Sequence, residues 1–342
     1  MNRESPDRRE SLRVLMLCPR LPTDDNPGSM APALRQFQSL RDAGVDLRCI
    51  DMTGPRIVKY GLRVPQVRRA ARSVDLVHAH YGFCGLLARC QLSRPIVMSF
   101  LGSDINGFHD ENGRIPFGAK LEIWTNRYIT SRLVSKIIVM SPEMAAKLAP
   151  LPVEIISNGI DVDAFCPRDR RAARTELNWD PHKTYVLFPA NPDNPHKGFS
   201  LAQQVVRLAS QQLGRDIELA PLWGYAPDQV PTVMNASDLV LMTSQKEGSP
   251  NVVKEAMACN VPVVCSPVGD VPDLLADLPG NRVCPRDAAA MATAVAELLQ
   301  SGEPSAGRQR LIDRNLTLAG VAQRIIDVYR SVLETNRLPS RS

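Results

Sequence analysis

The chain contains 342 residues, 44% hydrophobic and 23% charged, which suits about two globular domains and argues against a disordered or fibrous protein. Its net charge of +5 is too small to indicate nucleic-acid binding by itself. No apolar run reaches the ~18 residues of a membrane-spanning helix, and the eight cysteines show no C-x-x-C or zinc spacing, which predicts reduced thiols in a cytoplasmic protein.

The first half begins with a polar stretch and continues as alternating strands and helices. Residues 1–10 (MNRESPDRRE) are mixed in charge, unlike a signal peptide, and are expected to be a disordered lead-in. Short apolar runs predict buried parallel strands at 12–17, 45–52, 75–80, 95–100, 136–140 and 153–156. Helical periodicity predicts helices at 31–43 and 119–135. The apolar stripe of the second helix is expected to face the core; it comprises Leu121, Trp124, Tyr128, Ile129 and Leu133.

Two loops of the first half carry candidate functional residues. The connection 18–29 is long for a strand-to-helix loop, and Gly28 in it serves either an ordinary turn or a binding site. The strand DLVHAH places His78 and His80 on one face. A metal pair would need a third ligand that the spacing does not provide, and the alternatives are a core position or a place in a cleft for His80.

The stretch 53–74 contains only basic charges. Its cations are Arg56, Lys59, Arg63, Arg68, Arg69 and Arg72. One interpretation is a solvated basic face. The other is peripheral contact of residues 56–72 with an anionic membrane surface or a lipid-phosphate acceptor.

The second half repeats the alternation. Strands are predicted at 184–190, 217–220, 237–242, 261–265 and 282–284. Helices are predicted at 201–213, 227–235, 250–259, 287–299 and 318–334.

The most informative stretch lies between the strands 237–242 and 261–265. A polar loop leads to Ser249, a predicted N-cap, and Pro250, the predicted first helical residue. The loop follows the carboxyl end of a strand, where open α/β sheets bind ligands. Glu247 and Glu255 lie eight positions apart, and the amides between them suit phosphate or sugar oxygens. The alternative is two solvated glutamates.

Glu247 to Glu255, continued by the sequence AMACNVPVV, resembles the E-x7-E region of the retaining glycosyltransferases of family 4, which have the GT-B fold. Members of this family transfer a sugar from a nucleotide diphosphate to an acceptor. The resemblance implies that Glu247 contacts the donor sugar during catalysis and that Glu255 holds the ribose. It also implies that the stretch of Gly248, Ser249, Pro250 and Asn251 surrounds the sugar and diphosphate and presents backbone amides to them.

The same resemblance assigns roles to other loops of the second half. Lys197 is expected to neutralise the donor diphosphate. It is expected to supply more of the positive charge than in relatives, because Asn191 stands where they usually have Arg. Trp223 and Gly224 are candidate contacts of the nucleobase, with simple packing as the alternative. The turn 268–270 is expected near the diphosphate, or Asp270 only caps a helix.

In the first half, the resemblance implies an acceptor side. The loop with Gly28 is expected to face the acceptor, and His80 to lie in the cleft. Gly102 and Asp104 match the family pattern, although Leu101 replaces a His that lies near the donor sugar in relatives. Asn158 is expected in a turn at the domain junction.

These observations together predict an α/β protein with a GT-B fold, two facing Rossmann-like domains with a cleft between them. The expected domains are 1–165 on the acceptor side, 166–317 for the nucleotide sugar, and a helix at 318–336 that crosses back. The expected activity is glycosyl transfer with retention, without metal or cofactor, from a nucleotide sugar to a saccharide or lipid-linked acceptor. Polysaccharide or glycoconjugate biosynthesis of the bacterial type is the expected setting, with no nucleic-acid partner.

Three rival functions remain at this stage. A sugar-nucleotide epimerase or a phosphorylase could use the same fold. A non-catalytic two-domain sugar-binding protein is a third option, but exported binders need a signal peptide. A dinucleotide oxidoreductase is disfavoured because no G-x-G-x-x-G follows a strand.

Overall fold

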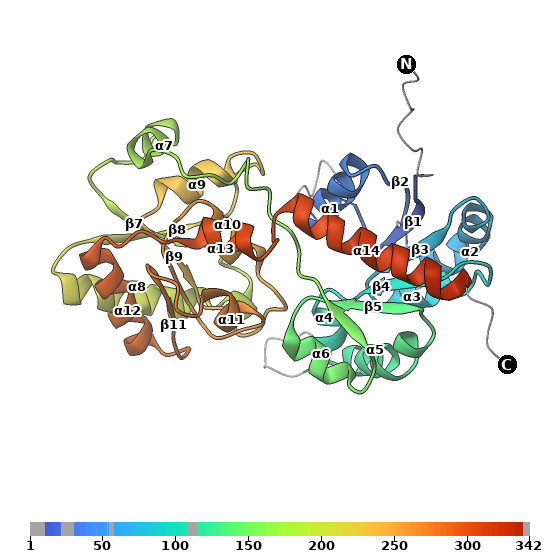
Figure 1. The fold of residues 1–342 in the computed structure, drawn as a ribbon. Coiled ribbons are helices and arrows are strands. Elements are labelled where there is room, and N and C mark those ends of the chain that lie inside the picture. The colour runs from blue at the N-terminus through green and yellow to red at the C-terminus, as the bar shows by residue number, and fades with distance from the viewer. Residues whose placement is uncertain (1–10, 22–30, 53, 55–57, 108–114, 338–342) are drawn as a thin grey trace, which may run out of the picture.

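Two separate parallel sheets form the framework of the molecule (Figure 1). The structure is a computed structural model that describes residues 11–21, 31–52, 54, 58–107 and 115–337. The first sheet has the strand order β2-β1-β3-β4-β5-β6, and the second has the order β11-β10-β9-β7-β8. All pairings of neighbouring strands in both sheets are parallel. The expected α/β class with two Rossmann-like sheets is therefore confirmed.

The first sheet and its helices come from residues before 156. Its strands are β1 Arg13–Cys18, β2 Asp46–Asp51, β3 Leu76–His80, β4 Ile96–Ser99, β5 Lys136–Val139 and β6 Val153–Ile155. Its helices are α1 Ala31–Asp42, α2 Val58–Ala71, α3 Gly82–Arg89, α4 Ser103–Asn106, α5 Phe117–Tyr128, the 3-10 turn η1 Thr130–Arg132, and α6 Pro142–Leu148.

The second sheet and its helices follow. Its strands are β7 Thr184–Phe188, β8 Ile217–Pro221, β9 Leu239–Met242, β10 Val263–Cys265 and β11 Asn281–Val283. Its helices are α7 Arg170–Glu176, η2 Pro195–Lys197, α8 Phe199–Leu213, α9 Val230–Ala236, α10 Asn251–Ala258, α11 Val271–Leu275, α12 Ala288–Ser301 and α13 Gly307–Asp313. The chain ends in α14 Leu318–Arg337.

The central strands are buried on both faces. β3 and β9 are buried at every position, as the continuous apolar runs predict for parallel strands covered by helices. One core fills the first domain, and two cores cover the two faces of the second sheet. Within the described residues, no helix combines the length and the hydrophobicity of a membrane span.

Helix α14 completes the core of the first domain. Its side chains Val321, Ile325 and Tyr329 are buried among first-domain residues, and the helix lies beside α1 (Figure 1). The two segments that cross between the domains are paired, because Ile160 forms a parallel bridge with Thr317. The amide of Ile160 donates to Leu316 O, and the amide of Leu318 donates to Ile160 O, both at 2.9 Å. The two crossings therefore run side by side.

One expectation about the first domain is wrong. The predicted helix 119–135 ends at Tyr128 and is followed by the 3-10 turn η1, and its apolar stripe faces solvent. The buried face of α5 contains Ala119 and Asn126 instead, and the Asn126 amide donates to Asp104 O at 2.9 Å. Periodicity identified the stripe, but it does not say which face of the helix meets the protein. The helices α2, α3, α4, α7 and α13 had no prediction.

Candidate functional site

The carboxyl ends of two adjacent strands bring Lys197 and Glu247 into contact. Lys197 lies after β7 and Glu247 after β9, and these strands are neighbours in the second sheet. The Lys197 ammonium lies 2.6 Å from Glu247 Oε1, and both side chains are partly buried. The two residues expected to handle the diphosphate and the donor sugar are thus joined in an ion pair.

Backbone contacts fix the loop that carries Lys197. Thr243 Oγ1 at the end of β9 lies 2.8 Å from Lys197 O and 2.9 Å from Gly198 O. The Gln245 amide donates to His196 O at 3.0 Å. These bonds hold the loops after β7 and β9 together, so Lys197 and Glu247 stay close without depending on their own ion pair.

Glu255 meets a cation from the other domain. Both terminal nitrogens of Arg35, on α1, donate to Glu255 Oε1 at 3.1 Å. Burial raises the pKa of Glu255, and the charge and hydrogen bonds of Arg35 oppose that rise. The carboxylate expected to hold the ribose is therefore oriented by the first domain, and Arg35 engages only one of its two oxygens.

Ser249 is not the N-cap of α10, and that prediction is wrong. The cap position is Pro250, which has no side-chain donor or acceptor for the task, and the helix begins at Asn251. The Ser249 hydroxyl donates instead to Asp270 Oδ2 at 2.6 Å. The alternative role for Asp270 is also absent, since its side chain forms no cap hydrogen bond.

Lys254 completes a buried network behind this loop. Its side chain is fully buried, and Nζ donates to Ser249 Oγ at 3.0 Å and to Asn158 O at 2.7 Å. Burial lowers the pKa of Lys254 to about 8, against the opposing charges of Asp270 and Glu255. The ammonium group of Lys254 therefore connects the loop 244–250, which we call the donor loop, to the domain junction at Asn158.

Glycines allow the backbones to approach closely here. A Cβ on Gly269 would lie 2.2 Å from Gly248 O, so no side chain fits at position 269. Across the cleft, a Cβ on Gly102 would come within 3.8 Å of Gly248. Lys246 also reaches across and donates to Asn106 O at 2.8 Å. The expected residues Gly102 and Gly248 thus face each other between the domains.

Asp104 and the histidines point inward rather than into an open cleft. The Asp104 carboxylate accepts from the amides of Leu101 and Gly102 at 2.9–3.1 Å, and burial raises its pKa to about 7. His78 lies between Tyr329 Oη at 2.7 Å and Ser99 Oγ at 2.8 Å. His80 is 1% exposed, and burial lowers its pKa to about 4.

The histidine pair lacks the partners of a metal site in the described part of the chain. No group of three or more His, Cys, Asp or Glu residues there could hold a metal ion. All eight cysteines are free thiols, as the sequence predicted.

The remaining predicted residues have varied surroundings. Trp223, after β8, is 64% exposed, so the alternative of packing into the core does not apply. Gly224 follows it in an open turn. Asn191 accepts from the amide of Asp193 at 2.9 Å and so closes its own turn. Gly28 lies outside the described residues.

Buried polar atoms without partners gather near these loops. Among the described residues, such atoms include both ring nitrogens of His80, Asn106 Nδ2, Ser244 Oγ, Asn251 Oδ1 and Asp270 Oδ1. Unpaired buried polar groups are costly in a folded protein and often indicate a place for a ligand or water. Their concentration around the loop 244–251 supports a binding site there.

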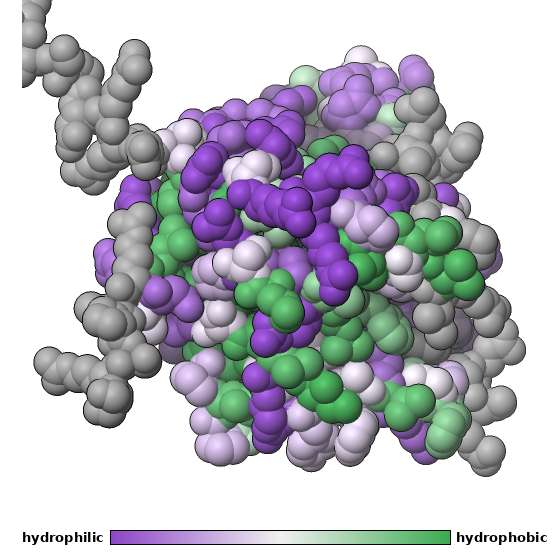
Figure 2. All heavy atoms as spheres, turned by 90° about the vertical axis from the view of Figure 1, so that its right-hand side faces the viewer, coloured by the Kyte–Doolittle hydropathy of each residue, from purple (hydrophilic) through white to green (hydrophobic). Residues whose placement is uncertain are grey.

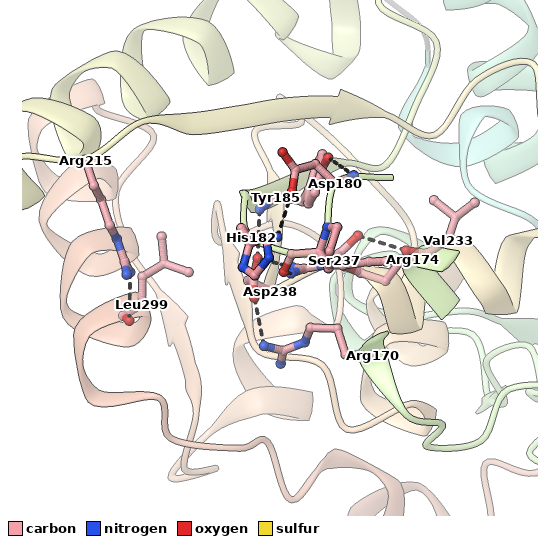
Figure 3. Close-up of polar contacts among 12 residues, drawn as sticks. Arg170, Arg174, Asp180, His182, Tyr185, Arg215, Val233, Ser237, Asp238 and Leu299 are labelled. Atoms are coloured by element: carbon pink, nitrogen blue, oxygen red, sulfur yellow. Dashed lines mark hydrogen bonds and ion pairs between the residues drawn. The ribbon is translucent and has the colours of Figure 1, made fainter. Parts of the chain in front are cut away.

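A second polar cluster lies at the other end of the strands of the second sheet (Figure 3). Asp238 pairs with Arg170 at 2.7 Å and with Arg174 at 2.6 Å, and it accepts from the Tyr185 amide at 2.7 Å. These contacts lie at the amino ends of β7 and β9 and fasten α7 to the sheet. Ligands of parallel sheets bind at the carboxyl ends, so this cluster is a structural brace.

Cavity size does not identify the site. Between Lys197, Ser244 and Val252 the free volume is only about 10 Å³. Hollows of about 620 and 660 Å³ lie elsewhere, one along α8 and β8 and the other around α11 and β11. The chemistry of the loops, rather than the largest hollow, therefore defines the candidate site.

Sequence reasoning missed Arg35 and Lys254. Arg35 lies 220 residues before Glu255, and no local pattern links them. Lys254 stands on the same short helix as Glu255, where a lysine ordinarily points to solvent. The one available signal was the apolar character of the positions around it, Val253 directly before and Ala256 two residues after.

Comparisons with known families match both domains. The family model described as "Glycosyltransferase Family 4" matches residues 12–164, and the one described as "Glycosyl transferases group 1" matches residues 196–301. The D-inositol 3-phosphate glycosyltransferase of Rhodococcus jostii is 27% identical over 251 residues, covering 61% of this chain and 55% of the relative. That of Mycobacterium sp. (strain KMS) is 27% identical over 282 residues, covering 72% and 63%. The matched region thus spans little more than half the length of these relatives.

Solved structures share the whole fold. Sucrose-phosphate synthase from Thermosynechococcus elongatus superposes with a TM-score of 0.71 at 16% identity, covering 95% of this chain and all of that chain. HepE of Anabaena, in complex with UDP and glucose, gives a TM-score of 0.70 at 16% identity, covering 94% of this chain and all of that chain. At such identities the likeness establishes the GT-B arrangement of the two sheets.

Proposed function

Since the chain belongs to the group 1 glycosyltransferases of family 4, with the GT-B fold, we propose that it transfers a sugar from a nucleoside-diphosphate sugar to a saccharide or lipid-linked acceptor. The observation that carries this proposal is the contact of Lys197 with Glu247, in the loop that leads to Glu255 on α10. A cation for the diphosphate, a carboxylate for the sugar and a carboxylate for the ribose are thereby gathered at one edge of the second sheet.

The donor extends from Trp223 to Glu247 in this proposal. The base lies against the exposed ring of Trp223, and the ribose hydroxyls donate to the Glu255 oxygen that Arg35 leaves unbound. The diphosphate meets Lys197 and the amides at the start of α10, which lack acceptors within the helix. UDP is the first nucleotide to test, because the similar structure of HepE contains it.

Transfer proceeds with retention and without a metal. The bond between the anomeric carbon and the phosphate oxygen breaks, and the acceptor oxygen bonds to the same face of that carbon. The acceptor proton passes to the leaving phosphate oxygen, so no protein base is required. The Lys197 ammonium stabilises the charge that builds on the phosphate, and Glu247 accepts hydrogen bonds from the sugar hydroxyls.

Binding requires the Lys197–Glu247 contact to loosen. An ammonium has three N–H donors, so Lys197 can keep one bond to Glu247 while it donates to phosphate. We expect donor entry also to move the loop 244–250, because the Gln245 amide of that loop bonds His196 O beside Lys197. The close contact of Gly102 with Gly248 lets such a movement reach the first domain.

The names of the relatives guide the choice of acceptors. The relatives are named for D-inositol 3-phosphate, so this phosphorylated polyol belongs in an acceptor panel beside lipid-linked sugars. Contact of the basic stretch 56–72 with a membrane stays a proposal. The cytoplasmic location and the role in polysaccharide or glycoconjugate biosynthesis stay predictions from the sequence.

A nucleotide screen followed by product analysis tests this function. Nucleoside diphosphates are added to the full chain, and ligand at about 100 times Kd should stabilise it by about 2.7 kcal/mol. The matching donor sugar is then incubated with the acceptor panel. A glycosylated product supports transfer. An altered donor sugar without acceptor indicates an epimerase, dependence on free phosphate indicates a phosphorylase, and binding without turnover indicates a sugar-binding protein.

A further inference from the structure

Exposed apolar side chains are concentrated on one helix of the first domain. Thirteen large hydrophobic residues are exposed among the described residues, and six of them lie between positions 117 and 133. Four stand on α5: Phe117 is 82% exposed, Leu121 54%, Trp124 52% and Tyr128 54%. We call these four residues the α5 face. Such a concentration differs from the scattered exposed apolar residues of ordinary surfaces.

The spacing of these residues gives them a common direction. They occupy positions i, i+4, i+7 and i+11, which at 100° per residue fall within about 60° around the helix axis. Trp124 and Tyr128 also touch, with ring centroids 6.0 Å apart. The opposite side of α5 is anchored by Ala119 and Asn126, so the helix cannot turn this face inward.

Cations accompany the α5 face. Lys120 and Arg132 are exposed beside it, and the Arg132 guanidinium lies 5.7 Å from the centre of the Tyr128 ring. The single acidic residue between positions 115 and 136 is Glu122, which lies on the other side of the helix. Aromatic rings flanked by Lys and Arg are characteristic of helices that lie in the interface of an anionic bilayer.

The neighbouring helix α2 has the same character. Val58 is 62% exposed and Leu62 70%, and no acidic residue occurs from 58 to 74. Helix α3 lies between the two: its Phe83 ring is 5.6 Å from the Tyr60 ring of α2, and its Gly82 packs on Asn126 of α5. Figure 2 views the end of the molecule formed by the first domain, where hydrophobic and hydrophilic residues are interspersed below a more hydrophilic upper part.

The opposite, buried side of α5 packs toward the place where the two domains meet. Asn126 donates to Asp104 O and Arg127 donates to Ile105 O, so α5 packs on α4. The donor loop touches the end of α4 through the bond from Lys246 to Asn106 O. The α5 face, on the other side of the helix, takes no part in these contacts.

From this geometry we infer that the α5 face, with the exposed cations beside it, docks on an anionic phospholipid bilayer. The four apolar side chains enter the interface between headgroups and acyl chains, and Lys120 and Arg132 contact lipid phosphates. The charge of the surroundings favours this occupant over a second copy of the chain, since the exposed acidic side chains that could meet these cations are missing from the described part of both helices. The inference concerns binding to lipid alone and needs no donor or acceptor.

Vesicle co-sedimentation tests the inference with the full chain. We expect binding to vesicles of phosphatidylcholine mixed with phosphatidylglycerol, weaker binding to phosphatidylcholine alone, and weakening by salt. Phe117→Ser combined with Trp124→Ser should lower the partition coefficient at least roughly tenfold, because two large apolar side chains no longer leave water. Lys120→Glu combined with Arg132→Glu should reduce binding to anionic vesicles selectively.

Matched controls exchange similar residues of the second domain. Ile312→Ser removes an exposed apolar side chain, and Arg171→Glu combined with Arg207→Glu removes two exposed cations. Both controls should bind vesicles like the wild type. Because all altered side chains are exposed, thermal unfolding should be unchanged in each variant.

Three results would overturn the inference. The first is a wild-type chain that stays in solution with anionic vesicles. The second is a Phe117→Ser/Trp124→Ser variant that sediments as well as the wild type. The third is a wild-type dimer in sedimentation velocity that the same substitutions dissociate, which would assign the α5 face to a second copy of the chain.

Discussion

The guanidinium group of Arg35 donates two hydrogen bonds of 3.1 Å to a single oxygen of Glu255, and the two residues belong to different domains. The Glu255 carboxylate, which is proposed to bind the ribose, is thus oriented by the first domain. That is the domain proposed to receive the acceptor. A donor bound through Glu255 is then sensitive to the position of α1. This contact makes the relation between the two domains testable through nucleotide binding alone.

Arg35→Met should weaken nucleotide binding, and the loss should come from the contact between Glu255 and the ribose. Without Arg35, the buried Glu255 carboxylate loses its cation, its pKa rises further, and it becomes a poorer acceptor. We expect the Kd for UDP to rise roughly tenfold, on the scale of a hydrogen bond to a charged group. The measurement is calorimetry with UDP and 2′,3′-dideoxy-UDP, whose affinities should converge. Gln38→Met, at an exposed position of α1, is the control.

The two glutamates should separate binding from transfer. Glu255→Ala is expected to weaken binding of free nucleotide, since the ribose loses its acceptor. Glu247→Ala should leave free nucleotide binding intact and abolish transfer, since its carboxylate faces the sugar side next to Lys197. Titration of both variants with nucleotide, with and without the sugar, is the measurement. Equal affinity of the two variants for free nucleotide would show that the division of roles is wrong.

Lys197→Ala should lower kcat by roughly 10²-fold or more, the usual effect of removing one preorganised electrostatic donor. Charge builds on the phosphate as the glycosidic bond breaks, so the cation stabilises the transition state more than the ground state. Steady-state kinetics with the cognate donor measure this effect. Lys183→Ala is the matched control, because Lys183 pairs with Glu218 on an exposed surface near the amino end of β7.

Asn191→Arg should be tolerated and should tighten donor binding. Asn191 is partly exposed and closes only a local turn, so a longer side chain at this position has room to extend. An added cation beside Lys197 would share the charge of the diphosphate. Kinetics of this variant, alone and combined with Lys197→Ala, are the test; no recovery in the double variant would place Asn191 away from the diphosphate.

Because of Lys254, the free energy of unfolding should rise with pH in the alkaline range. Its folded-state pKa of about 8 lies below the usual lysine value of 10.5, so the unfolded chain binds more protons between these pH values. The sign of the linkage relation then makes the contribution of Lys254 to stability rise with pH across this window, by up to about 3 kcal/mol. Urea unfolding at pH 7 and near pH 10 should show this gain in the wild type relative to Lys254→Met. A parallel pH dependence of the two proteins would contradict it.

Activity should persist in a chelator. In the proposed site the positive charge beside the diphosphate comes from Lys197 and the amides of α10, so no bound cation is needed for the leaving group. The assay compares transfer with and without EDTA, and with added Mg²⁺ or Mn²⁺. A loss of activity that these ions restore would require a different account of the leaving group.

Local patterns predicted most of the fold. The continuous apolar runs marked the strands because parallel strands lie between two layers of helices, and β3 and β9 are buried throughout. The α5 face shows the limit of such patterns. Its periodicity is the same whether the stripe meets a core or solvent, and the deciding contact, Asn126 with Asp104 O, joins residues in separate elements.

The candidate site divides in a similar way. Glu247 and Glu255 were identified from their spacing after a buried strand, and Lys197 from the resemblance to the family; the structure brings Lys197 and Glu247 together. Arg35 could not be identified, since its partner lies in the other domain. Ser249 was misassigned because the same hydroxyl that suits an N-cap also suits Asp270, and only the folded position of the 266–270 loop decides between them.

The return of α14 to the first domain has a consequence for the order in which the chain can fold during synthesis. Tyr329 leaves the ribosome about 250 residues after His78, yet its hydroxyl lies 2.7 Å from the His78 ring and its side chain is fully buried in the first core. Until the last residues emerge, the nascent first domain has an open apolar groove and an incompletely paired histidine. The second domain can thus mature before the first is finished, although it is made later.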